Sequence, residues 1–169
     1  MEKNQAINME ENLLEKEGKY LTFSLAQEEY GIGILQVKEI IGMMPITSVP
    51  RTPDFVKGVI NLRGKVIPVI DLRLRFSMEE IDYTERTCII VVETIGSSGD
   101  TVMGIVVDSV SEVLNIKAES IEPAPAFGTN LNTDYILGMA KLEGGVKILL
   151  EIDKVLSAQE IAVLEQVAC

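Results

Sequence analysis

Between residues 19 and 156 the chain alternates short apolar runs with polar breaks. The runs are rich in Ile, Val and other β-branched residues, and each is bounded by Gly, Asp, Asn or Ser, as is typical of strands separated by turns. Several runs are apolar on both faces, as expected when one face lines a small barrel and the other packs against a second unit. The pattern predicts a mostly β fold. The predicted strands are KYLTFSL, EEYGIGI, GVINL, KVIPVI, TCIIVVE, TVMGIVVD, ILGMAKL and VKILLEI.

The chain also contains an internal repeat. YGIGILQVKEII, from Tyr30, aligns without gaps with MGIVVDSVSEVL, from Met103. DFVKGVINLRGKVIPVIDL, from Asp54, aligns without gaps with DYILGMAKLEGGVKILLEI, from Asp134. Glycines fall at equivalent positions in both alignments, which favours a duplication over the alternative that unrelated hairpins resemble one another. The repeat predicts two similar β units, 19–80 and 81–156.

Two terminal segments differ from this pattern. Residues 1–18 are polar and acidic apart from a few aliphatic side chains, and predict a flexible arm. Residues 157–169 predict an amphipathic helix that packs on the β units, because Ser157 can cap its start and Glu160 follows in the first turn.

Composition narrows the possible partners. The net charge is -11, and no dense Lys/Arg run is present, so nucleic acid and anionic membrane surfaces are disfavoured. No stretch is long and apolar enough for a signal peptide or a membrane span. The two cysteines, Cys88 and Cys169, do not suggest a disulfide framework. These features predict a soluble, cytoplasmic protein.

The sequence lacks the usual chemistry of an enzyme. It contains no histidine, which removes the commonest general base and metal ligand. Cys88 lies in a predicted strand and reads as a buried thiol, and neither a calcium loop nor a phosphate loop is present. We therefore expect no catalytic residue, metal or cofactor, and favour a binding module. Carboxylate-based catalysis remains a weaker alternative, which would need paired acids in an apolar pocket.

Four stretches carry a resemblance to a known family. EEYGIGILQVKEII, TPDFVKGVINLRGKVIPVIDLRLRF, GIVVDSVSEVL and EPAPAF resemble the CheW family of bacterial chemotaxis coupling proteins, from about Lys19 to the C-terminal helix. The resemblance implies two SH3-like five-stranded β-barrels packed side by side, with short helices and a C-terminal helix. It also implies a non-catalytic adaptor, monomeric when isolated. Such an adaptor links the cytoplasmic tip of methyl-accepting chemoreceptors to the regulatory domain of the chemotaxis histidine kinase CheA.

The same resemblance assigns surface residues. The family's receptor-facing positions match Val37, Glu39, Gly58, Arg63 and Val113. The kinase-facing surface maps less directly, to Cys88, Ile90, Met139 and Lys141 in the predicted strands TCIIV and GMAKL.

Arg63 carries the sharpest expectation. It precedes Gly64 at a hairpin tip, so its side chain is free to lie across a neighbouring strand. Because the resemblance places Arg63 and Glu39 on the same receptor-facing surface, we expect Glu39 to bind it bidentately in a partly buried pair. An ordinary solvated loop arginine is the alternative. In the second repeat Glu112 and Glu143 occupy the equivalent positions, so the same pair cannot form there.

A small-ligand function is a further alternative. Some members of the family carry a purine-binding label, and a cleft between two barrels could admit a nucleotide. With a net charge of -11 and no phosphate loop, such binding would need local cations to converge. The candidate cations are Arg63, Lys65, Arg73 and Arg75.

Overall fold

The computed structural model describes residues 16–96, 99–123, 135–156 and 160. Within them the chain forms short strands and a few short helical segments. The strands are β1 (Gly18–Leu25), β2 (Glu28–Gly33), β3 (Val37–Gly42), β4 (Val56–Leu62), β5 (Lys65–Asp71), β6 (Cys88–Gly96), β7 (Gly99–Val107), β8 (Ser109–Ile116), β9 (Ile121–Glu122), β10 (Ile136–Leu142) and β11 (Gly145–Leu150). The helical segments are η1 (Ile34–Gln36), α2 (Leu72–Arg75), η2 (Ala118–Ser120) and α3 (Ile152–Val155).

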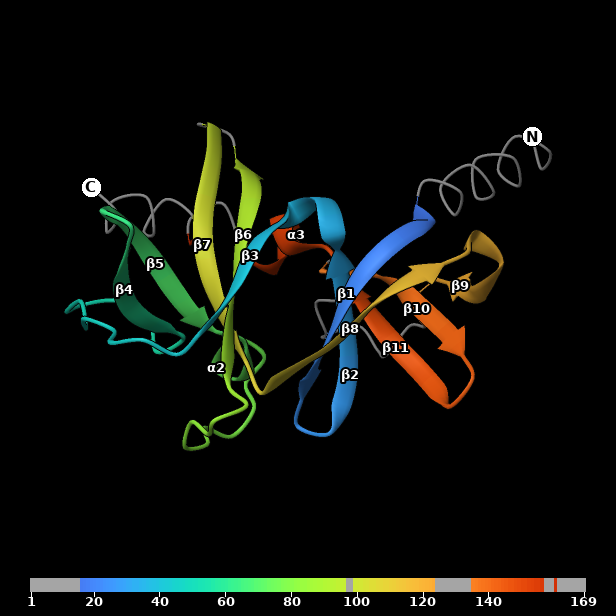
Figure 1. Ribbon diagram of the computed structural model, residues 1–169, viewed down its shortest axis with the longest axis horizontal. Coiled ribbons are helices and arrows are strands. Elements are labelled where there is room, and N and C mark those ends of the chain that lie inside the picture. Colours follow the sequence, from blue (N-terminus) through green and yellow to red (C-terminus); the bar gives the residue numbers. More distant parts are fainter. Residues whose placement is uncertain (1–15, 97–98, 124–134, 157–159, 161–169) are drawn as a thin grey trace.

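The strands form two mixed sheets that lie side by side (Figure 1). Barrel A has the strand order β8-β1-β2-β11-β10-β9, and barrel B has the order β3-β6-β7-β5-β4. Each sheet combines antiparallel hairpins with one parallel pair, β2 with β11 and β5 with β7. The predicted mostly β fold with two side-by-side β units is therefore confirmed.

The sheets do not follow the boundary that we predicted at residue 80. The hairpin β1-β2 belongs to barrel A with β8 to β11, whereas β3 to β5 belong to barrel B with β6 and β7. Each barrel therefore combines a hairpin from one repeat with three principal strands from the other. The exchange follows from short connections, because one residue, Asp108, separates β7 from β8. Both edges of β7 are already paired, with β5 and with β6, so the next strand cannot join the barrel B sheet beside β7.

The repeat corresponds to equivalent elements of structure. Strands β4 and β10, and helices α2 and α3, begin and end at equivalent positions of the two copies. The register between β4 and β5 shifts between Val56 and Gly58, and that between β10 and β11 shifts at the equivalent Ile136 and Gly138. Three strands were missing from our predicted strands: β3 and β8, which lie where the chain crosses between the barrels, and the two-residue β9.

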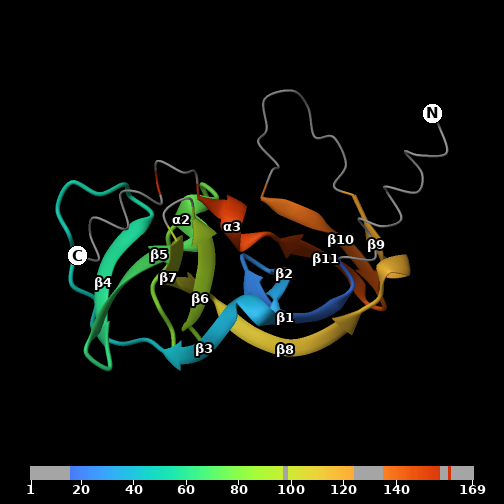
Figure 2. The ribbon, with the colours of Figure 1, turned by 90° about the horizontal axis from the view of Figure 1, so that it is seen from above.

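Three groups of buried apolar side chains hold the fold together. The largest takes residues from both barrels, so the barrels share one core. The two barrels lie side by side in the second view as well (Figure 2). Each barrel also has an interior cluster of its own. The central cluster includes Leu21, Phe23, Ile32, Ile70, Ile90, Val92, Ile105 and Leu150. The interior clusters are Ile60, Ile67, Val69, Ile89, Val91 and Val106 in barrel B, and Tyr20, Ile116, Ile121, Ala140 and Leu149 in barrel A.

Two predictions fall largely outside the described residues. They are the arm at 1–18, of which residues 16 to 18 are described, and the helix at 157–169, of which Glu160 is described. Within the described part of the chain, no helix is long and apolar enough to span a membrane.

Candidate functional site

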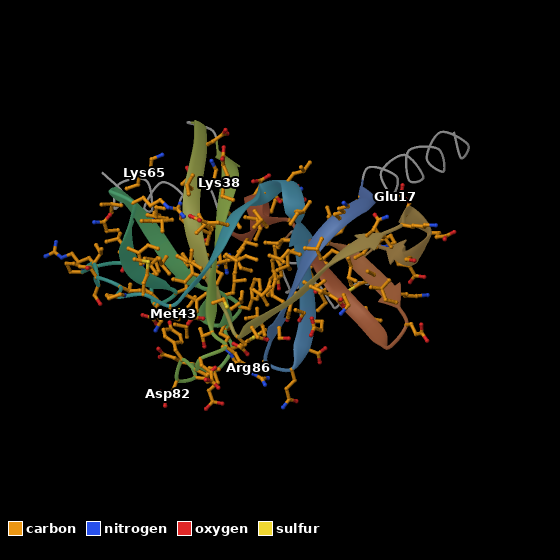
Figure 3. All side chains as sticks on the ribbon, in the orientation of Figure 1. Glu17, Lys38, Met43, Lys65, Asp82 and Arg86 are labelled. Carbon is orange, nitrogen blue, oxygen red and sulfur yellow. The ribbon has the colours of Figure 1, made fainter. Side chains whose placement is uncertain are left out.

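The tip of the β4-β5 hairpin places Arg63 at the end of barrel B. Arg63 and Gly64 have φ angles of 52° and 86°, and two successive positive φ values are characteristic of a type I′ hairpin turn. The side-chain Oδ1 of Asn61 accepts a hydrogen bond of 2.9 Å from the amide of Gly64, which holds the turn. The guanidinium is therefore presented from a tight and well-defined loop. Lys65, which follows this turn, is labelled at the upper end of barrel B in Figure 3.

Arg63 binds Glu39 bidentately, as predicted. Its Nη1 lies 2.8 Å from Oε1 and its Nη2 lies 2.7 Å from Oε2 of Glu39 on β3. These hydrogen bonds hold the pKa of Glu39 below its ordinary value. The pair joins the hairpin tip to β3, and β3 and β4 are the two outer strands of the barrel B sheet. The expectation of a partly buried pair holds for Glu39 alone, because the Arg63 side chain is 74% exposed and that of Glu39 is 26% exposed.

Gly58 has a different role from the one that we assigned. It is buried, so it does not present a surface to a partner. A Cβ built on Gly58 would lie 2.0 Å from the carbonyl oxygen of Thr47, and its φ angle is 143°. The close approach lets Thr47 and Val59 exchange two backbone hydrogen bonds of 2.9 Å. Gly58 therefore positions the connection between β3 and β4 against the hairpin that carries Arg63.

The apolar members of the predicted receptor surface come from both barrels. Val37 lies at the start of β3 and is half-buried against the central cluster. Val113 lies on β8, opposite Leu21 of β1, and is 50% exposed. The repeat counterpart of Val113 is Ile40, which follows Glu39 directly and is 43% exposed. Sequence reasoning missed Ile40, although the alignment of Tyr30 with Met103 could have identified it.

Leu35 is a second exposed apolar side chain that the sequence did not indicate. It lies on η1, between β2 and β3, and is 99% exposed. Its exposure depends on how the chain crosses between the barrels at this point, which the local pattern does not encode.

The second hairpin has a different surface. Glu143 at its tip and Glu112 on β8 are both exposed acids, so the ion pair of the first repeat has no counterpart, as predicted. Lys141 instead pairs with Glu122 of β9 at 2.5 Å. The equivalent regions of the two barrels therefore differ in charge.

The predicted kinase-facing residues do not form one surface. Cys88 and Ile90 belong to barrel B, and Met139 and Lys141 belong to barrel A. Ile90 is fully buried in the central cluster, so its assignment as a surface residue is wrong. Alternating strand residues point to opposite faces, and in β6 the face of Ile90 packs between the barrels. Cys88 and Met139 are half-buried, and Lys141 is exposed.

The four cations that a nucleotide would need do not converge. Arg63 and Lys65 lie at the tip of the hairpin, whereas Arg73 and Arg75 lie on α2, at the other end of β5 (Figures 1 and 3). Arg63 pairs with Glu39, Arg73 pairs with Asp108, and Arg75 lies 3.4 Å from Glu160. Among the described residues, no three His, Cys, Asp or Glu side chains gather as candidate metal ligands.

Comparisons with known proteins agree with this architecture. The CheW-like domain matches residues 19–160. Over 150 residues the chain is 47% identical to the chemotaxis protein CheW of Klebsiella aerogenes, with 89% of this chain and 88% of that protein covered. It is 32% identical over 155 residues to the chemotaxis protein CheW of Thermotoga maritima, with 90% and 95% covered.

A solved structure shows the same fold. The crystal structure of the scaffolding protein TtCheW from Thermoanaerobacter tengcongensis superposes with a TM-score of 0.75 at 38% sequence identity. The match covers 85% of this chain and 97% of that one. The two-barrel architecture, the domain match and the identity over most of the chain together show that this protein belongs to the CheW family of chemotaxis coupling proteins.

Proposed function

We propose that this protein is a non-catalytic adaptor that couples the cytoplasmic tips of chemoreceptors to the chemotaxis histidine kinase CheA. The observation that carries the proposal is the bidentate pair between Arg63 and Glu39 at the outer edge of barrel B. Ile40, which follows Glu39 on the edge strand β3, is also exposed, so this strand presents an apolar side chain as well as the charged pair. Protein interfaces commonly combine an apolar centre with a polar rim in this way.

The receptor-binding surface proposed here consists of Val37, Glu39, Ile40, Arg63 and Val113. Its members come from both barrels. Gly58 lies outside this surface and allows Thr47, in the connection between β3 and β4, to pack closely against β4. We propose that the apolar residues of this surface receive the apolar face of an amphipathic helix of the receptor tip. The Arg63 guanidinium would then fix the orientation of that helix through its exposed donors.

The kinase would bind outside the receptor-binding surface. Two chemically different barrels allow one small body to hold two partners at once, and Met139 and Lys141 on barrel A remain candidates for kinase contact. Relatives that match over most of the chain are named chemotaxis and scaffolding proteins, which supports a role in holding partners together.

A three-component retention assay tests this function. An immobilised receptor cytoplasmic fragment is mixed with the kinase regulatory domain, with and without this protein. We expect the regulatory domain to be retained strongly only when this protein is present. If the receptor fragment and the regulatory domain each fail to bind the wild-type protein, the adaptor proposal is wrong.

Arg63→Ala separates the two contacts in the same assay. The variant should lose retention on the receptor fragment and keep its affinity for the regulatory domain in solution. Lys19→Ala is a matched control, because it removes an exposed cation on β1 outside the proposed surface. If Arg63→Ala binds the receptor fragment as the wild type does, the site assignment is wrong while the adaptor function can still hold.

A further inference from the structure

A largely buried charged cluster joins the two barrels at the junction between β7 and β8. Arg73 of α2 donates two hydrogen bonds to Asp108, with Nε lying 2.7 Å from Oδ1 and Nη2 lying 2.6 Å from Oδ2. The Arg73 side chain is 13% exposed and that of Asp108 is 22% exposed. This pair is therefore much better shielded from water than the pair of Arg63 and Glu39.

Asp108 is also bonded to barrel A. Its Oδ2 accepts a hydrogen bond of 2.9 Å from the amide of Ala26, in the turn between β1 and β2. Its own amide donates to the carbonyl oxygen of Ser24 at 3.1 Å. Arg73 follows β5 of barrel B, so one aspartate connects a helix of barrel B to a hairpin of barrel A.

One further hydrogen bond restricts the Arg73 guanidinium. Its Nη1 donates to the carbonyl oxygen of Glu79 at 3.1 Å. Burial by itself would raise the pKa of Asp108, but the hydrogen bonds from Arg73 and from the Ala26 amide hold this pKa below its ordinary value. The carboxylate is therefore charged at neutral pH, and both of its oxygens accept hydrogen bonds.

The equivalent junction on the other side of the molecule lacks this arrangement. In the repeat alignment that pairs Tyr30 with Met103, Asp108 corresponds to Leu35, whose side chain is 99% exposed. In the alignment that pairs Asp54 with Asp134, Arg73 corresponds to Asp153. An aspartate and an exposed leucine cannot form the charged pair, so the connection is specific to the junction between β7 and β8.

We propose that Arg73, Asp108 and the Ala26 amide form a clamp that fixes the orientation of barrel A relative to barrel B, and thereby positions the two-barrel receptor surface. The central apolar cluster holds the barrels together, but apolar contact is non-directional and tolerates small rotations. Paired charge-assisted hydrogen bonds restrict both distance and angle. The link to receptor binding rests on the function proposed above, because that surface combines β3 of barrel B with Val113 of barrel A.

Residual dipolar couplings of backbone amides test the clamp without any partner. Couplings from each barrel are fitted to a separate alignment tensor, and the tensor axes are compared. We expect one common tensor for the wild type and diverging axes for Asp108→Asn, with a smaller divergence for Arg73→Lys, which keeps the charge but loses the bidentate geometry. Glu122→Gln is the control, because it removes an ion pair that lies within barrel A.

Receptor affinity provides the second measurement. Asp108→Asn should weaken binding to the receptor fragment at least fivefold, while Glu122→Gln binds as the wild type does. Common tensors for both clamp variants would overturn the proposal, whatever their stability. Diverging tensors with unchanged receptor affinity would overturn the positioning role. If the wild type itself fails to bind the fragment, the adaptor function is wrong, and the tensors still decide whether the clamp sets the barrel orientation. Should Asp108→Asn not fold, Arg73→Lys carries both measurements.

Discussion

Equivalent strands of the two repeats occur in the same order in barrels A and B, with β9 as an additional strand of barrel A. The side chains at equivalent positions differ. In barrel B the interior positions Ile60 and Ile67 are buried aliphatic residues. Their counterparts in barrel A are Ala140 and Lys147, and Lys147 lies 3.8 Å from Glu29. At these two positions barrel A therefore carries a smaller side chain and a charged one.

The hairpin tips differ in the same way. Arg63 at the tip of barrel B binds Glu39, whereas the equivalent positions of the second repeat, Glu143 and Glu112, are both acidic. Backbone features such as the bulges at Gly58 and Gly138 occur in both copies. The comparison indicates that the backbone changed little after duplication, whereas its side chains diverged.

The two bulge glycines offer the largest contrast in stability. Gly58→Ala should cost about 3 to 5 kcal/mol, since it adds backbone strain at a φ of 143° to a clash with the Thr47 backbone. Gly138→Ala should cost only about 1 to 3 kcal/mol, because its Cβ would meet the Ile121 side chain at 2.8 Å and the Glu122 oxygen at 3.0 Å without a positive φ. Urea unfolding measures both variants. Equal losses would mean that the two bulges are energetically equivalent.

The interior positions give the next contrast. Ile60→Ala should lower the free energy of unfolding by about 2 to 4 kcal/mol, because it opens a cavity at a side chain that is 2% exposed. The reverse change in the other barrel, Ala140→Ile, should cost about 1 to 3 kcal/mol through overpacking at a fully buried position. Thermal and urea unfolding test the pair. If Ala140→Ile is stabilising, the interior of barrel A contains unused space and the comparison must be revised.

The two junctions between the barrels should respond differently to acid. The folded pKa of Asp108 is below its ordinary value of 3.8, so its contribution to stability is present above that value and is lost as pH falls through the folded pKa. Asp108→Asn should cost about 1 to 3 kcal/mol at pH 7, between the values for exposed and fully buried pairs. Its deficit relative to the wild type should shrink below about pH 4.

Leu35→Ala serves as the control at the other junction. Because that side chain is 99% exposed, the substitution should leave the unfolding curve unchanged at every pH. A deficit of Asp108→Asn that persists unchanged at pH 3 would contradict the charged clamp. Urea unfolding between pH 3 and pH 7 provides the data.

Substitutions at the two hairpin tips should differ in their effect on receptor binding, and both should leave the stability of the protein nearly unchanged. Arg63→Ala is expected to weaken receptor binding at least tenfold, since Glu39 loses its bidentate partner, whereas Glu143→Ala should bind normally. Neither change should shift the melting temperature detectably, because both side chains are exposed. The double variant Glu39→Arg with Arg63→Glu should recover part of the affinity if the pair itself matters. Titration calorimetry with a receptor fragment measures all three, and equal losses for Arg63→Ala and Glu143→Ala would contradict a surface specific to barrel B.

Local sequence determined much of this protein. Eight of the strands and the duplication follow from residue types and spacing, because side-chain alternation and turn chemistry act over a few residues. The contact between Arg63 and Glu39 was predicted only with the help of the family resemblance, because the hairpin tip alone favours a solvated arginine. The burial of Ile90 was misassigned because both faces of β6 are apolar, so local pattern cannot tell an inner face from an outer one.

Only the tertiary structure decided which strands pair. Strands β3 and β8 were not predicted, since β3 alternates half-buried with exposed positions and much of β8 is exposed or half-buried, including charged side chains such as Lys38 and Glu112. They pair with β6 and β1 of the opposite repeat because the short connections at residues 34–36 and at Asp108 carry the chain onward into the other barrel. The clamp at Arg73 and Asp108 arises from the same exchange. Two similar repeats offer similar strand edges to each other, so local sequence leaves the pairing open and the length of the connections decides it.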